Sequence, residues 1–285
     1  MIRSALFVPG DQLELVDKLR RLRIEDRPDL LILDLEDSVA PSGKSAARAA
    51  VAAAIANDLW HGDLAVRINA GQAGAEDLAA IHSVGGPITC VPKADHRSIS
   101  MVAEAIESRG GSVRLWALIE SAAGLRDLDP VCSTPGVVQL ALGEVDLCAD
   151  LGVRAGTMHA LWPLRMQVVA ASARSGLRGP IGPASVDLND LERFETEGLQ
   201  LRDAGFSGQL AIHPKQLPRI HRVFTPTRSE IADARRVLDR YEEALKGGQG
   251  VITDEDGSMV DEAVVRSARR VLAQSSGESC SGGCQ

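Results

Sequence analysis

Two acids that follow short apolar runs are the residues best placed to do chemistry in this sequence. Glu120 directly follows the run 114–119, and Asp146 comes shortly after the run 137–142. Such runs between turn signals predict buried parallel strands, and acids just past such strands lie where β/α folds place their sites. Two neighbouring strand ends would then offer two oxygen ligands to a hard cation such as Mg²⁺, which keeps waters for a substrate to displace. Alternatively, both acids cap the helices that follow or lie in their first turns.

Polar residues also end the other predicted strands and would meet at one mouth of a barrel. Arg67 has the planar fork that binds a carboxylate in bidentate fashion; the alternative is an ion pair with Glu36 or Asp37. Lys93 would place charge near the metal or serve as a partner of Glu120. The complete set is Glu36, Asp37, Arg67, Asn69, Lys93, Glu120, Asp146 and His213. For His213, which precedes Pro214, a packed position on the rim is the preferred interpretation.

Strand-like and helix-like segments alternate along most of the chain. Strands are predicted at residues 5–9, 30–35, 64–69, 88–93, 114–119, 137–142, 179–183 and 210–213. Eight such units separated by helices favour a (β/α)₈ TIM barrel, with the seventh unit the weakest. Two helices, 227–246 and 261–273, follow as a C-terminal extension. The predicted organisation is a catalytic barrel at 1–226, a helical extension and lid at 227–274, and a disordered Gly/Ser-rich tail at 275–285.

Composition excludes several functional classes. The net charge of −8 without a basic cluster argues against nucleic acid as a partner. No apolar run reaches transmembrane length and the N-terminus does not resemble a secretory signal, so a cytoplasmic protein is expected. Dinucleotide-binding, P-loop, serine-hydrolase and common zinc motifs are missing. Cys90, Cys132 and Cys148 are expected to be buried small hydrophobes, and Cys280 with Cys284 is only a weak zinc signal.

Eight short motifs stand in order along the chain. They are Arg3-Ser4-Ala5-Leu6-Phe7-Val8-Pro9-Gly10, Leu33-Asp34-Leu35-Glu36-Asp37-Ser38-Val39-Ala40, Val66-Arg67-Ile68-Asn69-Ala70, Val91-Pro92-Lys93, Ile119-Glu120-Ser121, Gly143-Glu144-Val145-Asp146, Ile212-His213-Pro214-Lys215-Gln216 and Asp256-Gly257-Ser258-Met259-Val260-Asp261. In order and spacing they resemble the citrate lyase beta-like branch of the HpcH/HpaI aldolase superfamily, to which malyl-CoA and citramalyl-CoA lyases also belong. The resemblance runs from Arg3 to about Leu272.

The resemblance implies a Mg²⁺-dependent carbon–carbon lyase on a β/α barrel, often a homotrimer. It implies that Asp261 lies on a C-terminal lid, closes over the site of a neighbouring subunit and transfers a proton. By this resemblance Glu120 and Asp146 are the metal ligands, Arg67 binds the substrate carboxylate, and Phe7 and Lys18 contact the CoA ester. Together with the polar strand ends, this gives Arg67, Asp261, Glu36 and Asp37 as the expected catalytic residues. The expected substrate-binding residues are Arg67, Glu120, Phe7, Lys18, Lys93 and His213. Two residues differ from those common in the family: Val145, which precedes the metal aspartate, and Glu262, which follows Asp261. Because of these differences, the resemblance does not identify the substrate.

The expected reaction is reversible cleavage of a 3-hydroxy-3-carboxy acyl-CoA thioester into an acyl-CoA and a 2-oxo acid. Malyl-, citramalyl- and citryl-type esters all fit this description. One alternative is hydrolysis of the same thioester at the same site. Another is a beta subunit of a multi-chain citrate lyase that acts on an acyl-carrier thioester.

Overall fold

The chain divides into two compact units in the computed structural model, which describes residues 1–154, 158–248, 250–253 and 257–276. One unit runs from Ile2 to Arg222 and the other begins at Val223. The predicted domain limits at residues 226 and 274 remain predictions. Cys280 and Cys284 lie outside the described residues, as does most of the predicted tail. No helix in the described ranges is long and apolar enough to cross a membrane.

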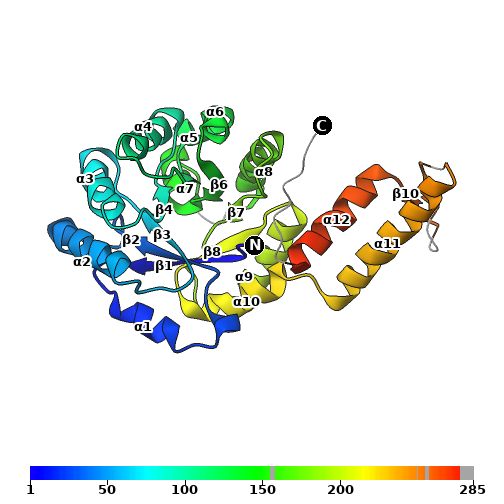
Figure 1. The fold of residues 1–285 in the computed structure, drawn as a ribbon, viewed down its shortest axis with the longest axis horizontal. Helices are drawn as coiled ribbons and strands as arrows, with labels where there is room; N and C mark the ends of the chain where they lie inside the picture. Colours follow the sequence, from blue (N-terminus) through cyan, green and yellow to red (C-terminus); the bar gives the residue numbers. More distant parts are fainter. Residues whose placement is uncertain (155–157, 249, 254–256, 277–285) are drawn as a thin grey trace. The chain divides into compact units, whose positions relative to one another are not determined.

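Eight parallel strands close into a barrel in the larger unit, and β8 pairs with β1 (Figure 1). They are β1 (Ser4–Pro9), β2 (Leu30–Asp34), β3 (Asp63–Arg67), β4 (Ile88–Val91), β5 (Leu115–Ile119), β6 (Val137–Leu142), β7 (Ile181–Gly182) and β8 (Gly208–Ala211). The predicted (β/α)₈ barrel is confirmed. The weak seventh unit is real but short, because β7 pairs with β6 through a single residue pair, Ala141 with Ile181.

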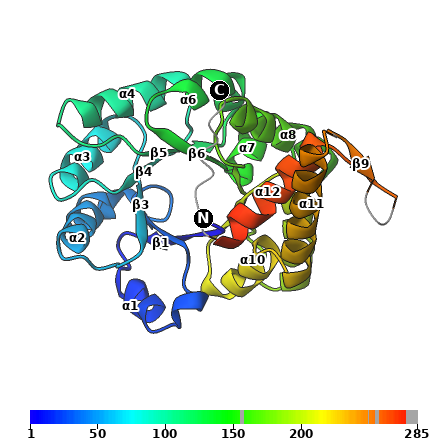
Figure 2. The same cartoon turned by 45° about the vertical axis from the view of Figure 1, so that its right-hand side comes forward.

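Helices surround the strands, as Figures 1 and 2 show. They are α1 (Glu14–Arg20), α2 (Lys44–Ala56), α3 (Gly71–His82), α4 (His96–Glu107), α5 (Ala122–Arg126), α6 (Leu128–Ser133), α7 (Glu144–Leu151), α8 (Met158–Arg174), α9 (Leu191–Asp203) and α10 (Leu217–Phe224), with short 3₁₀ turns η1 (Ile24–Asp26), η2 (Pro41–Gly43) and η3 (Pro214–Gln216). The sequence did not predict α5, α6 and α7. The last of these matters most, because it begins one residue after Gly143 and carries Asp146 in its first turn.

Side chains from all eight strands fill the barrel. Alternate positions contribute them, as a pleated strand with one inward face requires. The cluster consists of Ala5, Leu30, Ile32, Ala65, Ile88, Cys90, Trp116, Leu118, Ala141, Ile181 and Leu210. This cluster is mainly aliphatic, with Trp116 as its one fully buried large aromatic member. Cys90, Cys132 and Cys148 are buried and free, as predicted.

Two helices and a small hairpin make up the second unit. Helix α11 (Arg228–Lys246) begins with a capping box in which Thr227 and Glu230 satisfy each other's backbone amides. Strands β9 (Ile252–Thr253) and β10 (Met259–Val260) pair in antiparallel fashion, and α12 (Glu262–Ser276) follows. Helices α11 and α12 lie side by side in Figure 2, around a core of Tyr241, Val260 and Val265.

Candidate active site

A cavity of about 390 Å³ lies at the carboxyl ends of the barrel strands. It collects polar side chains from β2, β3, β5 and the start of α7, and apolar side chains from β1, β5, β6 and the segments around β7 and β8. Its lining is Phe7, Pro9, Asp34, Asp37, Ser38, Arg67, Leu118, Glu120, Leu142, Gly143, Glu144, Val145, Asp146, Ala184, Val186, Leu210 and Ile212. The structure therefore brings together five of the predicted site residues: Phe7, Asp37, Arg67, Glu120 and Asp146.

Arg67 uses its fork on a carboxylate of the chain itself. Its Nε and Nη2 donate to the two oxygens of Asp34 at 2.6 and 2.7 Å. Asp34 and Arg67 lie opposite each other at the ends of the paired strands β2 and β3, and this pairing brings the two residues side by side. Burial alone would lower the pKa of Arg67, but the hydrogen bonds and charge of Asp34 outweigh burial and raise it. Burial would raise the pKa of Asp34, but the hydrogen bonds and charge of Arg67 outweigh burial and hold that pKa below its ordinary value.

The third guanidinium nitrogen of Arg67, Nη1, faces Glu36 and Asp37, the two acids expected as its alternative ion-pair partners. Nη1 lies 3.2 Å from Glu36 and 3.5 Å from Asp37. The guanidinium stands over the Phe7 ring at 4.8 Å, which favours the cation on that face. In this structure Asp34 occupies the fork of Arg67, and Nη1 faces Glu36 and Asp37. That Arg67 binds a substrate carboxylate stays a prediction.

Glu120 is held in one position by two backbone features. It is 2% exposed, and its Oε1 accepts the Lys93 amide at 2.8 Å. Lys93 adopts a φ of +45°, a left-handed conformation that is uncommon for lysine. On the other side Gly143 leaves no room to spare, because a Cβ there would lie 2.6 Å from Glu120 Oε2. Ser121, rather than Glu120, caps α5, so Glu120 is not a helix cap.

Glu120 and Asp146 have the donor chemistry of a divalent cation site. Burial raises the pKa of Glu120 to about 8; the Lys93 amide opposes this rise, and the charges of Glu36 and Asp146 add to it. Among the described residues neither Glu120 nor Asp146 forms an ion pair, and no three acidic, His or Cys side chains are arranged around one point. Two carboxylates without a cationic partner fit an ion such as Mg²⁺ that takes few protein ligands and keeps waters.

Asp146 lies in the first turn of α7, which is the backbone position expected if it were simply a first-turn acid of a helix. That turn is anchored by the residue two positions earlier. The buried Arg165 of α8 binds Glu144 through both Nε and Nη2, the latter at 2.7 Å. Arg165 also stands over the Trp162 ring at 4.8 Å. A first-turn acid remains available to a cation, because Asp146 lines the cavity and accepts no capping bond within the part of α7 described.

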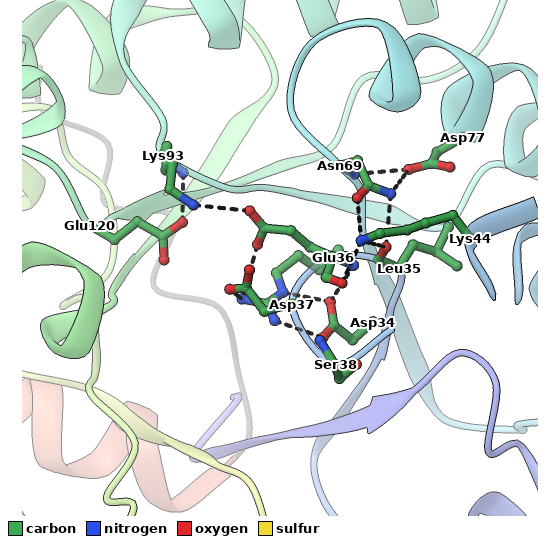
Figure 3. A network of polar contacts seen from close by, with 11 residues as sticks. Asp34, Leu35, Glu36, Asp37, Ser38, Lys44, Asn69, Asp77, Lys93 and Glu120 are labelled. Carbon is green, nitrogen blue, oxygen red and sulfur yellow. Dashed lines mark hydrogen bonds and ion pairs between the residues drawn. The ribbon is translucent and has the colours of Figure 1, made fainter. Parts of the chain in front are cut away.

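Figure 3 shows a polar network that reaches the cavity from the helices outside the barrel. Lys44 Nζ donates to the backbone oxygens of Leu35 and Glu36 at 2.8 and 2.6 Å and to Asn69 Oδ1 at 2.6 Å. Asn69 is in turn held by Asp77. The loop so positioned presents the Glu36 carboxylate to Lys93 Nζ at 3.2 Å.

Burial raises the pKa of Glu36, and the charge of Asp37 adds to the rise, against the opposing charges of Arg67 and Lys93. Burial would lower the pKa of Lys93, but the charge and hydrogen bond of Glu36 raise it. Lys93 thus carries a charged ammonium, as the sequence suggested, and its partner is Glu36 through the side chain and Glu120 through the amide.

Two predicted site residues of the barrel, Lys18 and His213, belong neither to the cavity lining nor to the network of Figure 3, and a third, Asp261, belongs to the second unit. Lys18 is exposed on α1. His213 caps η3 by accepting the Lys215 amide on Nδ1, in line with the preferred rim interpretation. Asp261 belongs to the second unit and caps α12, where its Oδ1 accepts the amides of Ala263 and Val264 at 2.9 and 3.1 Å.

Comparison with known proteins agrees with this architecture. Residues 3–214 match the HpcH/HpaI aldolase/citrate lyase family. The chain belongs to that family. The resemblance inferred from the eight motifs is thereby confirmed, as are the strand-end positions of Arg67 and Glu120 in a β/α barrel.

Relatives within the HpcH/HpaI family carry different activities in their names. The chain is 31% identical to the citrate lyase subunit beta of Escherichia coli K12 over 95% of this chain and 92% of that one. It is 30% identical to a (3S)-malyl-CoA thioesterase of Cereibacter sphaeroides over 95% and 94%. Among solved structures, CitE from Mycobacterium tuberculosis in complex with magnesium, acetoacetate and coenzyme A superposes with a TM-score of 0.79 at 26% identity, covering 96% of this chain and 98% of that chain.

Several residues that shape the site escaped the sequence interpretation. Asp34 lies within one of the eight motifs, but only the pairing of β2 with β3 shows that it faces Arg67. Lys44 belongs to none of the eight motifs, and its sequence context does not indicate its three acceptors. Gly143 and Arg165 act through close packing and a contact between helices distant in sequence, neither of which has a local sequence signature.

Proposed function

We propose that this chain is a Mg²⁺-dependent lyase of CoA esters, which reversibly cleaves a 3-hydroxy-3-carboxy acyl thioester into an acyl-CoA and a 2-oxo acid. The observation that carries the proposal is the pair Glu120 and Asp146, two carboxylates that form no ion pair with any residue that the structure describes, in a cavity that also contains Arg67. Membership of the HpcH/HpaI family and the relative named citrate lyase subunit beta support it. The CitE structure with magnesium, acetoacetate and coenzyme A supports the choice of metal and ester.

Glu120 and Asp146 would hold the cation, which when bound supplies a Lewis acid for the carboxylate and hydroxyl oxygens of the substrate. In the cleavage direction the substrate hydroxyl gives its proton to a carboxylate of the cavity, for which Asp37 is the candidate, and the bond between the carbinol carbon and the thioester α-carbon breaks. The electron pair of that bond passes to the thioester enolate. Arg67, the one cation that lines the described cavity, stabilises the developing negative charge. Asp34 and Glu36 keep its guanidinium in place, and the Lys93 amide keeps Glu120 in place.

Asp261 is proposed to return a proton to the enolate carbon, from a lid that closes over the site of a neighbouring subunit in a homo-oligomer such as a trimer. Because Asp261 also caps α12, the informative change is Asp261→Asn, which preserves the cap and removes the acid. We expect an unchanged melting temperature and a large loss of kcat. A mixture of Asp261→Asn and Glu120→Ala chains should regain activity once subunits exchange. Full activity of Asp261→Asn alone would remove it from the reaction.

The direct test is turnover of malyl-, citramalyl- and citryl-CoA by the purified chain with Mg²⁺, with 2-oxo acid and free thiol measured in parallel. Lyase action releases stoichiometric 2-oxo acid and acyl-CoA without free thiol. Glu120→Ala and Asp146→Ala should each abolish turnover, and EDTA should do the same to the wild type. Absence of cleavage of all three esters, in a protein that melts cooperatively, would overturn the proposal.

Hydrolysis of the same thioester is a second candidate, favoured by the relative named (3S)-malyl-CoA thioesterase. It would release free thiol without stoichiometric 2-oxo acid, so the same assay separates the two. A beta subunit of a multi-chain citrate lyase would instead act on an acyl-carrier thioester and leave the CoA esters intact.

A further inference from the structure

The first turn of α7 lies between two cavities. Glu144 and Val145 line the candidate cavity and also a second cavity of about 290 Å³, to which α8 and α9 contribute side chains. Asp146, the next residue, lines the candidate cavity. With a cavity on each side, close packing constrains this turn less than it constrains a segment of the protein core. The turn that carries a candidate metal ligand therefore needs another means of being held in place.

The residues on either side of this turn are anchored by contacts of their own. Before it, the Gly143 amide donates to the Ile119 oxygen at 3.0 Å, but Gly143 has no side chain with which to cap the helix. After it, Leu147 is fully buried, and Asp150 accepts the Ala122 amide at 2.7 Å. The position of the first turn itself then depends on what its own side chains bind.

Glu144 ties the first turn to the neighbouring helix α8. Its two carboxylate oxygens accept hydrogen bonds from Nε and Nη2 of Arg165, the latter at 2.7 Å. Arg165 is 3% exposed, and its guanidinium stands over the Trp162 ring at 4.8 Å. Two parallel hydrogen bonds from a planar group restrict both the distance and the orientation of the carboxylate. The pair fixes Glu144 relative to α8, and with it the backbone that carries Asp146 two residues later.

The ion pair of Arg165 with Glu144 adds little to folding stability in comparison with two apolar side chains. Burial removes both charges from water, and this cost offsets much of their mutual attraction. Nη1 of Arg165 is also buried and has no hydrogen-bond partner within the ranges that the structure describes, which adds a desolvation cost. Replacement of both partners by apolar side chains should therefore leave the melting temperature almost unchanged. Loss of Arg165 alone should lower it, because the Glu144 carboxylate then stays partly buried without its cation.

We propose that Arg165 is a positioning residue for the metal site, which acts through Glu144 to set the place of Asp146 relative to Glu120. This inference rests on the proposed function, because it takes Glu120 and Asp146 as the ligands of the cation. Mg²⁺ requires near-ideal octahedral geometry. Displacement of one carboxylate ligand therefore lowers the affinity for the cation even though both carboxylates are retained. Loss of a residue that orients a ligand typically costs roughly 10- to 100-fold in metal affinity.

Binding of Mn²⁺ to the full chain, measured from the electron paramagnetic resonance signal of the free ion and competed with Mg²⁺, tests this without turnover. We expect Arg165→Met to bind Mn²⁺ roughly 10- to 100-fold more weakly than the wild type. Arg165→Lys keeps the charge but cannot form the fork, so its affinity should lie between the two. Wild-type affinity in Arg165→Met would overturn the inference and leave the lyase proposal standing, whereas a wild type that binds no Mn²⁺ would overturn both.

Arg3→Met is the matched control for the loss of an ion pair. Arg3 binds both oxygens of Asp29 at 2.7 and 2.8 Å, and it lies just before β1, at the end of the barrel opposite the cavity. This variant should lower the melting temperature and leave the Mn²⁺ affinity unchanged. A loss of affinity equal to that of Arg165→Met would show that any broken ion pair has this effect and would overturn the inference.

A double variant with Arg165→Met and Glu144→Leu separates position from stability. Its melting temperature should return toward that of the wild type, because neither charge remains without its partner. Its Mn²⁺ affinity should stay as low as that of Arg165→Met, because nothing then ties the first turn of α7 to α8. Recovery of the melting temperature and the affinity together would mean that Arg165 acts through stability alone, which would overturn the positioning role.

Discussion

Gly143→Ala should impair the site by displacing Glu120, without removing any charged group. A Cβ at this position would lie 2.6 Å from Glu120 Oε2 and 2.8 Å from Glu120 Cβ, whereas ordinary contacts begin at 3.4 Å. The carboxylate must therefore move by about 0.4–0.8 Å to reach a separation of 3.0–3.4 Å. The φ of Gly143 is −99°, which alanine adopts freely, so the effect comes from the clash and not from the backbone.

The size of the loss follows from that displacement. A misplacement of about 1 Å in a reacting arrangement costs roughly 100-fold in rate, or about 2.7 kcal/mol in the barrier. Overpacking a buried position costs about 1–3 kcal/mol of folding stability. The 2.8 Å hydrogen bond from the Lys93 amide to Glu120 should lengthen as well. We expect a kcat/KM about 100-fold lower and a weaker apparent affinity for Mg²⁺.

The assay is cleavage of the best CoA ester across a Mg²⁺ titration, together with thermal unfolding. Gly43→Ala is the matched control, because its added Cβ meets Val39 at an ordinary 3.5 Å and its φ is −91°. It should leave both activity and melting temperature near the wild type. A Gly143→Ala enzyme that keeps kcat/KM within about twofold and an unchanged Mg²⁺ dependence would refute the argument that the position of Glu120 is critical.

Three further predictions concern Arg67, Lys93 and His221. Arg67→Lys keeps the charge but loses the fork held by Asp34, so kcat/KM and melting temperature should both fall; an unchanged kcat/KM would remove Arg67 from the site. Lys93→Gly should be about 1 kcal/mol more stable in chemical denaturation than Lys93→Ala, because φ of +45° strains alanine, and the reverse order would contradict the left-handed conformation. Burial lowers the pKa of His221 below its usual 6.5. The unfolded chain therefore binds a proton that the folded chain does not, and stability should fall as pH decreases below about 6.5. His221→Gln should show a shallower fall in melting temperature from pH 7.5 to 5, and equal slopes would count against this.

The sequence was sufficient for features that depend on local pattern. Apolar runs bounded by turns identified the eight strands, because a buried parallel strand needs a continuous apolar segment. Acids and bases just past those runs marked the mouth of the barrel, and the order of the motifs indicated the family. Glu120, Asp146 and Arg67 could be selected on this basis, since each lies at or just beyond a strand end.

Tertiary structure decided which of these groups act on one another. Asp34 takes the Arg67 fork because β2 and β3 pair in a register that places the two side chains together, and no local pattern encodes register between strands that lie 33 residues apart. The hydrogen bond from the Lys93 amide to Glu120 and the left-handed φ of Lys93 are visible only in the folded chain, and Gly143 matters because Glu120 packs against it. Sequence pattern records which surface each residue prefers, whereas pairing, close packing and backbone strain exist only once distant segments are brought into contact.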